Sequence, residues 1–551
     1  MNIKKNKIIK YLKTNKILIA FFAVLVIGVF FRLYKLDSIP FGLNNDAAWE
    51  GSAALDILRG NFKDYIPYAT EGWRGEAIVR VIVAIFTLIF GNSPINIKLA
   101  TTVFGIGILI PIYFLIKNLF NKNLALLTMF FIATSGWHII FSRSGWRAIS
   151  VPFFATLSFY FLFKGFENKK NGYFTASGIM LSIITFYTYD AGRIFPFLFF
   201  FWIFIEFISQ KNFIKTYFIQ LISLFLAFIV VSLPMIFYAI NNWTNFIGRS
   251  DYLFVGHQIE KTGNLNPLFE NIIKTLLLFN VSANGNDFFI YEPLLDDPAK
   301  ILFLAGIVLL IFFSIIKGRK NYFFILCWLI FSLIPGIISS PNGNRTIGAI
   351  PAVYFIIALA TYSLANFLFY FFNKIKIKTN YSTAIIIFVI CVYSISNTYQ
   401  TYFGPSRRDI VGFYPNTLVT STYIKTIWDK YDIYLTDNYP RELLTYFLYK
   451  NSSPNAFAAN YVWLENSNNF LAVVPSNYNN LAHNTPSDSQ VLGAYTSLDK
   501  GLAFFMFDND VNQEVANQLL KMYPNGQKFY IYNKTRDIYN VSSLVVLIPP
   551  N

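Results

Sequence analysis

The stretch "ILIAFFAVLVIGVFFRLYKLDSIPFGLNNDAAWEG", residues 17–51, joins an apolar run to a segment that carries acids. The apolar part is long enough to cross a bilayer, which takes about 20 such residues. It is too long for a signal-peptide core, and no small-residue cleavage pattern follows it, so we expect it to remain as a signal anchor. Asp46 and Glu50 then stand one helical turn apart, just where the chain leaves the membrane.

The composition is that of a protein with several membrane spans. Hydrophobic residues make up 55% of the 551 residues, aromatic residues 19% and charged residues only 13%, unlike an ordinary soluble domain. The formal net charge is +16, but the lysines cluster between apolar runs and form no basic module interleaved with aromatic residues. The charge therefore indicates topology, with membrane lipids and not nucleic acid as the partner.

Eleven apolar runs approach the length of a span. They are residues 15–35, 96–118, 123–140, 149–165, 173–189, 192–209, 214–240, 300–316, 321–338, 347–372 and 382–399. Cys327 and Cys391 both lie inside such runs, so neither a disulfide framework nor a cysteine metal site is expected. The sequence predicts a polytopic α-helical membrane protein with about 11 transmembrane helices.

Positive residues in the connections set the predicted orientation. With a cytoplasmic N-terminus, alternate connections contain lysine pairs or clusters, as at Lys117 and Lys122, which is typical of cytoplasmic loops. The other connections hold the acids, tryptophans and isolated arginines: residues 36–95, "FSRSGWRA" (141–148), "YDAGR" (189–193), 241–299, "SSPNGNRTIG" (339–348) and the tail after about 400. We therefore expect a multi-pass protein of the cell (plasma) membrane whose chemistry is extracytoplasmic.

Two domains are expected. Residues 1–400 form the transmembrane domain, and its first outer loop, 36–95, contains a short apolar run at 77–91 that fits an interfacial helix. Hydropathy falls in 401–551, where strand-like runs alternate with helical ones and predict a small extracytoplasmic α/β domain. The strand-like runs are "DIYLTD" (432–437), "NFLAVVPS" (469–476), "GLAFFMFD" (501–508), "KFYIYN" (528–533) and "SSLVVLIPP" (542–550). No glycine-rich phosphate loop opens a helix there, so a nucleotide-binding domain is not predicted.

The acids of the outer connections are candidates for proton transfer. A carboxylate at the membrane surface, partly desolvated by aromatic neighbours such as Trp49, can be tuned to act as a general base. Asp46 fits that description, and the alternative is that Asn45 or Asp46 only caps a helix that begins there. Glu50, Glu71, Glu76 and Asp190 are further acids on the same predicted side.

Four arginines in these connections are candidates for binding phosphate. They are Arg143, Arg147, Arg193 and Arg345. A planar guanidinium makes paired, charge-assisted hydrogen bonds to phosphate oxygens. Ordinary lipid headgroups are an alternative partner for Arg143 and Arg147, and an Asp190–Arg193 pair is open to a purely structural reading.

The sequence predicts no metal site and no cofactor. His138, His257 and His483 are isolated from one another, and no metal-ligand spacing of histidine or cysteine occurs. Carboxylate oxygens alone remain as ligands for a magnesium-like ion, so a divalent metal is conceivable but unsupported.

The order of motifs over residues 17–370 resembles the GT-C superfamily of integral membrane glycosyltransferases. Within it, the similarity is to the branch of dolichyl-phosphate-mannose protein mannosyltransferases and bacterial aminoarabinose transferases. The resemblance is carried by "FRLYKLDSIPFGLNNDAAWEG" (31–51), "AIVRVIVAIFTLIFGNSPINIKLATTVFGIGILIPIYFLIKNLF" (77–120), "SGWHIIFSRSGWRA" (135–148) and "IPGIISSPNGNRTIGAIPAVY" (334–354).

This resemblance implies a polyprenyl-phosphate sugar donor, interfacial helices in the first outer loop, and Asp46 as catalytic base. The chain departs from the family at Ala47, where relatives often carry a second acid. Glu50 or Asp190 would then have to replace that acid. The tail after 400 varies among relatives, and no function is carried onto it.

The expected reaction is transfer of a sugar from the lipid-linked donor to a hydroxyl of a protein, lipid or polysaccharide acceptor. Single displacement would invert the anomeric centre, with Asp46 as base and Arg143, Arg147 or Arg345 holding the departing phosphate. Three alternatives remain: a glycolipid transporter or flippase, a ligase that joins pre-assembled glycans from a lipid-linked donor, and a membrane anchor for the C-terminal domain. Paired repeats, which transporters commonly show, are not evident in the sequence.

Overall fold

The computed structural model divides the chain into two packing units. Unit 1 comprises residues 1–36 and 54–410, and unit 2 comprises residues 37–53 and 411–551. The structure describes residues 2–60, 76–283, 293–374, 382–404, 413–436, 439–448, 461–464, 500–535 and 538–550. Residues 37–53 contain Asp46 and Glu50, and their grouping with the C-terminal residues was not part of the sequence prediction.

Unit 1 is a bundle of long apolar helices, as predicted. Within the described residues, nine helices are long and apolar enough to cross a membrane, or ten when α6 (Lys122–Thr134) and α7 (Gly136–Arg143), bent by 56°, count as one broken span. The eleven predicted spans exceed this number by one. The remaining prediction, 173–189, corresponds to α9 (Asn171–Phe186), whose 16 residues fall short of a span by this measure.

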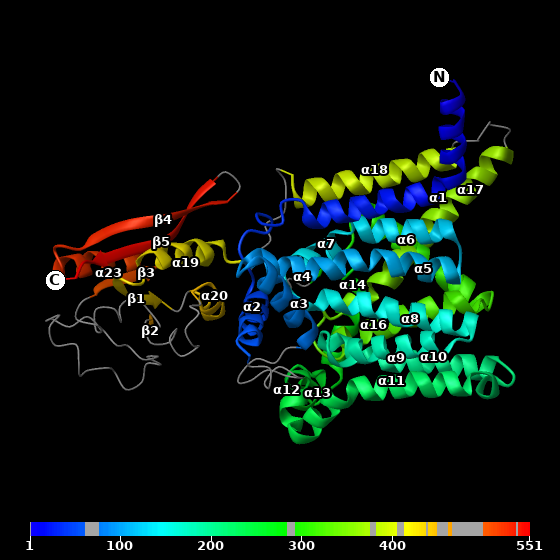
Figure 1. Cartoon of the computed structure of the whole chain (residues 1–551), viewed down its shortest axis with the longest axis horizontal. Helices are drawn as coiled ribbons and strands as arrows, with labels where there is room; N and C mark the ends of the chain where they lie inside the picture. The colour runs from blue at the N-terminus through cyan, green and yellow to red at the C-terminus, as the bar shows by residue number, and fades with distance from the viewer. Residues whose placement is uncertain are drawn as a thin grey trace. The chain divides into compact units, whose positions relative to one another are not determined.

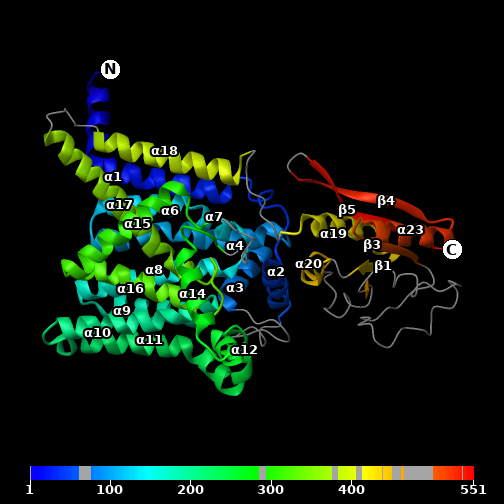
Figure 2. The same cartoon turned by 180° about the vertical axis from the view of Figure 1, so that it is seen from behind.

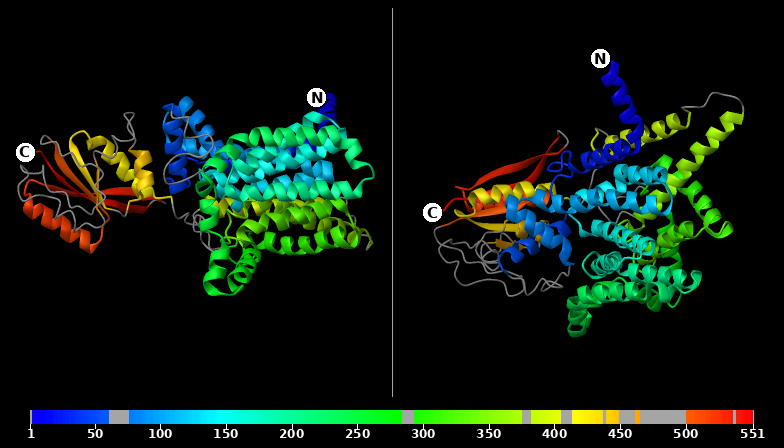
Figure 3. Two further views of the ribbon diagram at one scale, coloured as in Figure 1. Left: turned by 90° about the horizontal axis from the view of Figure 1, so that it is seen from below. Right: turned by 45° about the vertical axis from the view of Figure 1, so that its right-hand side comes forward.

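The remaining helices of the bundle follow the predicted runs closely. They are α1 (Asn2–Leu33), α4 (Pro94–Gly107), α5 (Leu109–Leu119), α8 (Ser150–Asn168), α10 (Phe195–Ser209), α11 (Phe213–Asn241), α15 (Asp297–Ile311), α16 (Lys320–Ile337), α17 (Ile350–Lys374) and α18 (Ser382–Tyr402). Figure 1 shows α6, α5, α8, α9 and α11 lying roughly parallel in succession, and Figure 2 shows α15 and α17 on the opposite side of the same bundle. The spans share one general direction in the view from below in Figure 3.

Short helices follow the spans in the predicted outer connections. In the first outer loop, α3 (Ala77–Phe90) buries Val79 and Val83 and exposes Val81, Ile85 and Leu88. Its 14 apolar residues are too few to span, which fits the prediction of a short helix at 77–91. The region between α11 and α15 contains α12 (Trp243–Tyr252), α13 (Val255–Thr262) and α14 (Asn266–Leu277).

Unit 2 contains a small α/β domain, as predicted. Its strands are β1 (Tyr431–Thr436), β2 (Tyr461–Leu464), β3 (Gly501–Met506), β4 (Gln527–Thr535) and β5 (Ile538–Ile548). They form one sheet in the order β2-β1-β3-β5-β4, parallel on the β2, β1, β3 side and antiparallel where β5 pairs with β3 and β4. The predicted strand 469–476 lies outside the described residues, and β2 was not predicted.

Helices cover both faces of this sheet. On one face, α23 (Asp510–Met522) contributes Val515 and Leu519 to a core that includes Phe504. On the other face, Ile424 of α19 (Pro415–Ile427) and Leu444 of α20 (Arg441–Phe447) pack on alternate strand residues. The alternation of strand side chains between the two faces explains why these strands read as continuous apolar runs.

Asp432 is a polar exception in this sheet. It stands on β1, its side chain is 6% exposed, and its Oδ2 atom makes no hydrogen bond among the described residues. Burial raises the pKa of this carboxyl to about 6, an effect that Lys500 partly offsets. The folded chain thus keeps a proton that the unfolded chain releases from about pH 4 upward, so the stability of this unit falls as the pH rises to about 6.

Replacing Asp432 by asparagine should remove this loss. We expect Asp432→Asn to stabilise the domain by about 2 kcal/mol at pH 8 and by much less at pH 4.5, because only the ionised carboxylate is penalised by burial. Thermal or denaturant unfolding of the full-length protein at both pH values measures the difference. The exposed Asp508→Asn is the control, and an equal effect of Asp432→Asn at both pH values would contradict the prediction.

Candidate functional site

The segment with the predicted base forms the start of a helix. The side chain of Asn44 accepts a hydrogen bond from the Ala47 N–H at 2.8 Å and so caps α2 (Asn45–Leu58). Asp46 is half-buried in the first turn, and Glu50, one turn later, is completely buried. The cap is thus Asn44, one residue before the two predicted from the sequence. Glu71 lies outside the described residues.

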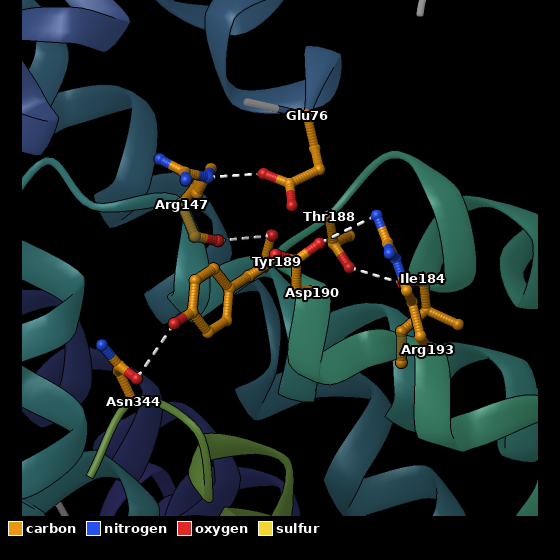
Figure 4. A network of polar contacts seen from close by, with 9 residues as sticks. Glu76, Arg147, Ile184, Thr188, Tyr189, Asp190, Arg193 and Asn344 are labelled. Carbon is orange, nitrogen blue, oxygen red and sulfur yellow. Dashed lines mark hydrogen bonds and ion pairs between the residues drawn. The ribbon is translucent and has the colours of Figure 1, made fainter. Parts of the chain in front are cut away.

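A buried ion pair joins the first outer connection to the second. Glu76 precedes α3, and Arg147 opens the short 3₁₀ helix η2 (Arg147–Ile149) that leads into α8. Their atoms Oε2 and Nε are 2.5 Å apart, and each side chain is only 4% exposed. Figure 4 shows the carboxylate facing the guanidinium. The contact satisfies two charges that would be costly to bury separately.

Tyr189 extends this pair to two further connections. The Arg147 guanidinium lies over the Tyr189 ring at 5.7 Å, and the Tyr189 hydroxyl donates to Asn344 Oδ1 at 3.1 Å. The Ile78 N–H also donates to the Tyr187 carbonyl at 3.3 Å. Four predicted outer connections, widely separated in sequence, therefore meet around one arginine (Figure 4).

Asp190 and Arg193 form a second ion pair next to Tyr189. Asp190 Oδ1 and Arg193 Nη2 are 2.9 Å apart, and the two side chains are 22% and 24% exposed. Both belong to η3 (Asp190–Ile194), and a Cβ at Gly192 would come within 2.1 Å of the Ile184 carbonyl oxygen, so this turn requires glycine. The Arg193 guanidinium lies over Phe246 at 4.5 Å. The predicted pair thus exists, with both side chains partly accessible.

Arg345 is held at the turn between α16 and α17. Its Nη1 donates to the Ser340 carbonyl at 3.0 Å, and its backbone N–H donates to Asn342 Oδ1 at 3.0 Å. The side chain is half-buried. Because Arg345 follows Asn344 directly, it lies one residue from the hydrogen bond to Tyr189.

Arg143 occupies a different position, at the end of α1. Its guanidinium is fully buried and donates to the carbonyls of Phe31, Tyr34 and Lys35 at 3.0, 2.8 and 3.0 Å. It also lies over the Tyr402 ring at 5.3 Å. These contacts suit a packing role, and the phosphate-binding role of Arg143 stays a prediction.

A second buried arginine mirrors this arrangement and was not predicted. Arg32 of α1 donates to the carbonyls of Ile132 and Ala133, at 2.9 and 2.8 Å, where α6 ends. Its Nη2 also lies 2.7 Å from His138 Nδ1. The apolar run of α1 ends in "FFRLY", and a single charge at the end of a span gives no sign of which distant carbonyls it will reach.

The chemistry available here is that of arginine, carboxylate and aromatic groups. Within the described ranges, no group of three or more histidine, cysteine or acidic side chains is placed to hold a metal ion. The Glu76 contact uses the Nε of Arg147 and orients its guanidinium, and Asp190 orients that of Arg193. Guanidinium groups held in this way are suited to stabilising an anion without rearrangement.

Structural comparison finds the same architecture in solved membrane transferases. ArnT from Cupriavidus metallidurans bound to undecaprenyl phosphate aligns with a TM-score of 0.57 and 11% identity, over 97% of this chain and 98% of that one. The Archaeoglobus fulgidus oligosaccharyltransferase AglB, in complex with an inhibitory peptide and a dolichol-phosphate, aligns with a TM-score of 0.52 and 13% identity, over 96% of this chain and 74% of that one.

The chain has the GT-C fold. The resemblance expected from the sequence is therefore confirmed, as is the class of polytopic helical protein with a small C-terminal sheet domain.

Sequence comparison agrees over part of the GT-C fold. Residues 78–237 match the family model of dolichyl-phosphate-mannose-protein mannosyltransferases. This region includes Arg147 and Arg193 but begins after Asp46 and Glu76, which lie outside it. A comparison with curated proteins finds no match.

The A. fulgidus protein is longer than this chain. A crystal structure of that oligosaccharyltransferase tethered with an acceptor peptide aligns with a TM-score of 0.50 and 17% identity over 80% of this chain. The chain spans 60% of the length of that protein as crystallised with the peptide and 62% of its apo form.

Removing one partner of the Glu76–Arg147 pair should be costly. We expect Glu76→Gln to destabilise unit 1 by about 3–5 kcal/mol, because it leaves a buried guanidinium without its counter-charge. Adding Arg147→Met should recover more than half of that loss. Unfolding in detergent of the single and double variants gives the coupling energy.

The exposed pair Lys164–Glu167, 2.6 Å apart, provides the matched control for this cycle. Its coupling should stay below about 1 kcal/mol. Additive effects of Glu76→Gln and Arg147→Met would show that the buried contact does not stabilise the fold.

Arg143→Lys separates the packing role of Arg143 from phosphate binding. A lysine keeps the charge but cannot reach three diverging carbonyls, so we expect a loss of roughly 2–3 kcal/mol of stability. Glycosyl transfer per folded molecule should change by less than about threefold. A hundredfold fall in transfer with unchanged stability would instead support the phosphate-binding role.

Proposed function

We propose that this protein is a membrane glycosyltransferase that moves a sugar from a polyprenyl-phosphate-linked donor to an extracytoplasmic acceptor hydroxyl. The observation that carries the proposal is the meeting of four outer connections around Arg147, at the ends of the spans of a GT-C fold. The lipid phosphates bound by ArnT and AglB support the class of donor.

In this proposal Asp46 acts as general base. It removes the proton from the acceptor hydroxyl while that oxygen attacks the anomeric carbon of the donor sugar. The bond between this carbon and the phosphate oxygen breaks at the same time, so the configuration inverts and the lipid phosphate leaves with both electrons. The proton remains on the Asp46 carboxyl until solvent removes it.

Arginines stabilise the departing phosphate. Arg193 and Arg345 are the partly accessible ones, and Arg147 is buried and oriented by Glu76. The charge on the leaving oxygen grows in the transition state, so fixed guanidinium groups accelerate the reaction more than they strengthen donor binding. Glu50 and Asp190 are the acids proposed to take the place of the one missing at Ala47.

One alternative has a specific observation in its favour. The alignments to an oligosaccharyltransferase, one of which has a tethered acceptor peptide, are consistent with transfer of a pre-assembled glycan by the same fold. A glycan ligase and a transferase of single sugars would share the base and the phosphate site. They differ in the donor that supports turnover.

Asp46→Asn tests the proposal. Membranes with the wild-type protein, Asp46→Asn or the control Asp37→Asn, an exposed acid of the same segment, are supplied with polyprenyl-phosphate donors carrying one labelled sugar or a longer glycan. We expect Asp46→Asn to lower transfer by about 10²–10⁴-fold, with equal amounts of folded protein, while Asp37→Asn stays near wild type.

The donor panel also decides between the alternatives. Turnover only with the longer glycan selects the ligase. Movement of labelled donor across the bilayer without transfer would identify the protein as a transporter. Full activity of Asp46→Asn would show that Asp46 is not the general base.

A further inference from the structure

A second polar site lies inside unit 1, and among the described residues no arginine lines it. It is a cavity of about 300 Å³ bordered by α6, α7, α17, α18 and the start of α15. That volume is at the small end of the range for ligand pockets, so it fits one small head group and not a long glycan.

The polar part of the cavity consists of hydroxyl, amide and carboxylate groups. Asp296 accepts from Asn397 Nδ2 at 3.0 Å, and the Ser135 and Tyr354 hydroxyls are hydrogen-bonded to each other. Tyr402 also lines the cavity, is only 5% exposed, and has the Arg143 guanidinium over its ring. Its hydroxyl is a further polar group that a ligand with hydroxyl groups would match.

The charge of the cavity disfavours phosphate. Of the described residues that line it, Asp296, Asp297 and Lys300 are charged, and none is an arginine. Lys300 is already paired with Asp297 at 2.7 Å. The Arg143 guanidinium over the Tyr402 ring donates to three backbone carbonyls, and Asp296 opposes an anion. A neutral head rich in hydroxyl groups can instead donate to the carboxylate and accept from the Tyr402 hydroxyl.

The rest of the lining is apolar. Phe131 of α6, Leu302 of α15 and Ile390 of α18 come from helices that qualify as membrane spans or as half of the broken span. A ligand with a hydrophilic head and an aliphatic chain satisfies both parts. A soluble sugar would leave the apolar part unused.

The cavity is linked to the arginine network through Trp137 and the turn at Gly343 and Asn344. Trp137 lines the cavity and donates from Nε1 to the Gly343 carbonyl at 3.2 Å. The next residue is Asn344, which accepts from Tyr189. A Cβ at Gly343 would come within 3.3 Å of the Trp137 Nε1 and 3.1 Å of Leu294, so the turn approaches the cavity wall closely. A head group bound here lies next to the proposed phosphate site but does not share its ligands.

We propose that this cavity binds the hydroxyl-bearing head of a membrane-embedded lipid acceptor. That the bound lipid is an acceptor rests on the proposed function, whereas binding of a neutral, hydroxyl-rich amphiphile is a property of the cavity itself. It places the acceptor among lipids, and it assigns Asn397, Asp296 and Tyr402 to head-group recognition.

Protection of an engineered cysteine measures the binding directly. Ser394 lines the cavity from α18, so Ser394→Cys is introduced together with Cys391→Ser, and the protein is placed in lipid nanodiscs. The rate of alkylation by N-ethylmaleimide is measured with octyl glucoside below its micellar concentration and with monooctyl phosphate. Val392→Cys, on the exposed side of α18, is the matched control.

We expect octyl glucoside to slow alkylation of Ser394→Cys at least tenfold, with little effect from monooctyl phosphate or on Val392→Cys. Adding Asn397→Leu should abolish the protection, whereas Arg193→Gln, at the partly exposed ion pair, should leave it intact. Equal protection by both probes would show that the cavity binds only the alkyl chain. Stronger protection by monooctyl phosphate would indicate a donor site, and no protection would show that neither probe binds. Each of these three results overturns the proposal.

The two proposals fail in distinguishable ways. If the protein is not a glycosyltransferase, no donor will support transfer while cysteine protection persists. If transfer occurs and Asn397→Leu raises the KM for a lipid acceptor without lowering kcat, the cavity is an acceptor site. Unchanged KM together with lost protection would separate the cavity from the reaction.

Discussion

The buried guanidinium groups of Arg32 and Arg143 constrain how one end of the bundle packs. Arg32 of α1 reaches the carbonyls at the end of α6, and Arg143, at the end of α7, reaches the carbonyls at the end of α1. Helix C-termini carry unsatisfied carbonyls and partial negative charge, so each arginine neutralises a helix end and is itself solvated by it. In apolar surroundings this reciprocal arrangement fixes α1 against the broken span.

The break between α6 and α7 is followed by two arginines, Arg143 and Arg147, that lie in different surroundings. Ser135 accepts from the His138 N–H and caps α7 after the 56° bend. α7 ends at Arg143, and four residues later Arg147 meets Glu76 and Tyr189. Two arginines one short turn apart thus receive different environments: Arg143 donates to backbone carbonyls and lies over the Tyr402 ring, whereas Arg147 is paired with a carboxylate and lies over the Tyr189 ring.

Much of the fold followed from hydropathy, and the site followed only in part. Apolar runs predicted the spans and α3, and β-rich runs predicted β1, β3, β4 and β5, because both patterns are local. The Asp190–Arg193 pair could also be predicted from the sequence, since its members are three residues apart. Tyr189, Asn344 and Arg32 were missed because their partners lie far away in sequence, over 100 residues for Arg32. Nothing in the sequence around Tyr189 or Asn344 indicates such a distant contact.

The polar interior of unit 1 divides by charge into two regions. Arginines gather where Glu76, Tyr189 and Asn344 meet, and the cavity beside Trp137 contains carboxylate, amide and hydroxyl groups. In the proposed reaction one substrate is an anionic lipid phosphate and the other a neutral alcohol. Exchange of the two substrates between the regions is then disfavoured on electrostatic grounds, because phosphate would face Asp296 and a neutral head would leave the guanidinium groups without an anion. The contact of Trp137 with the turn at Gly343 and Asn344 links the two regions.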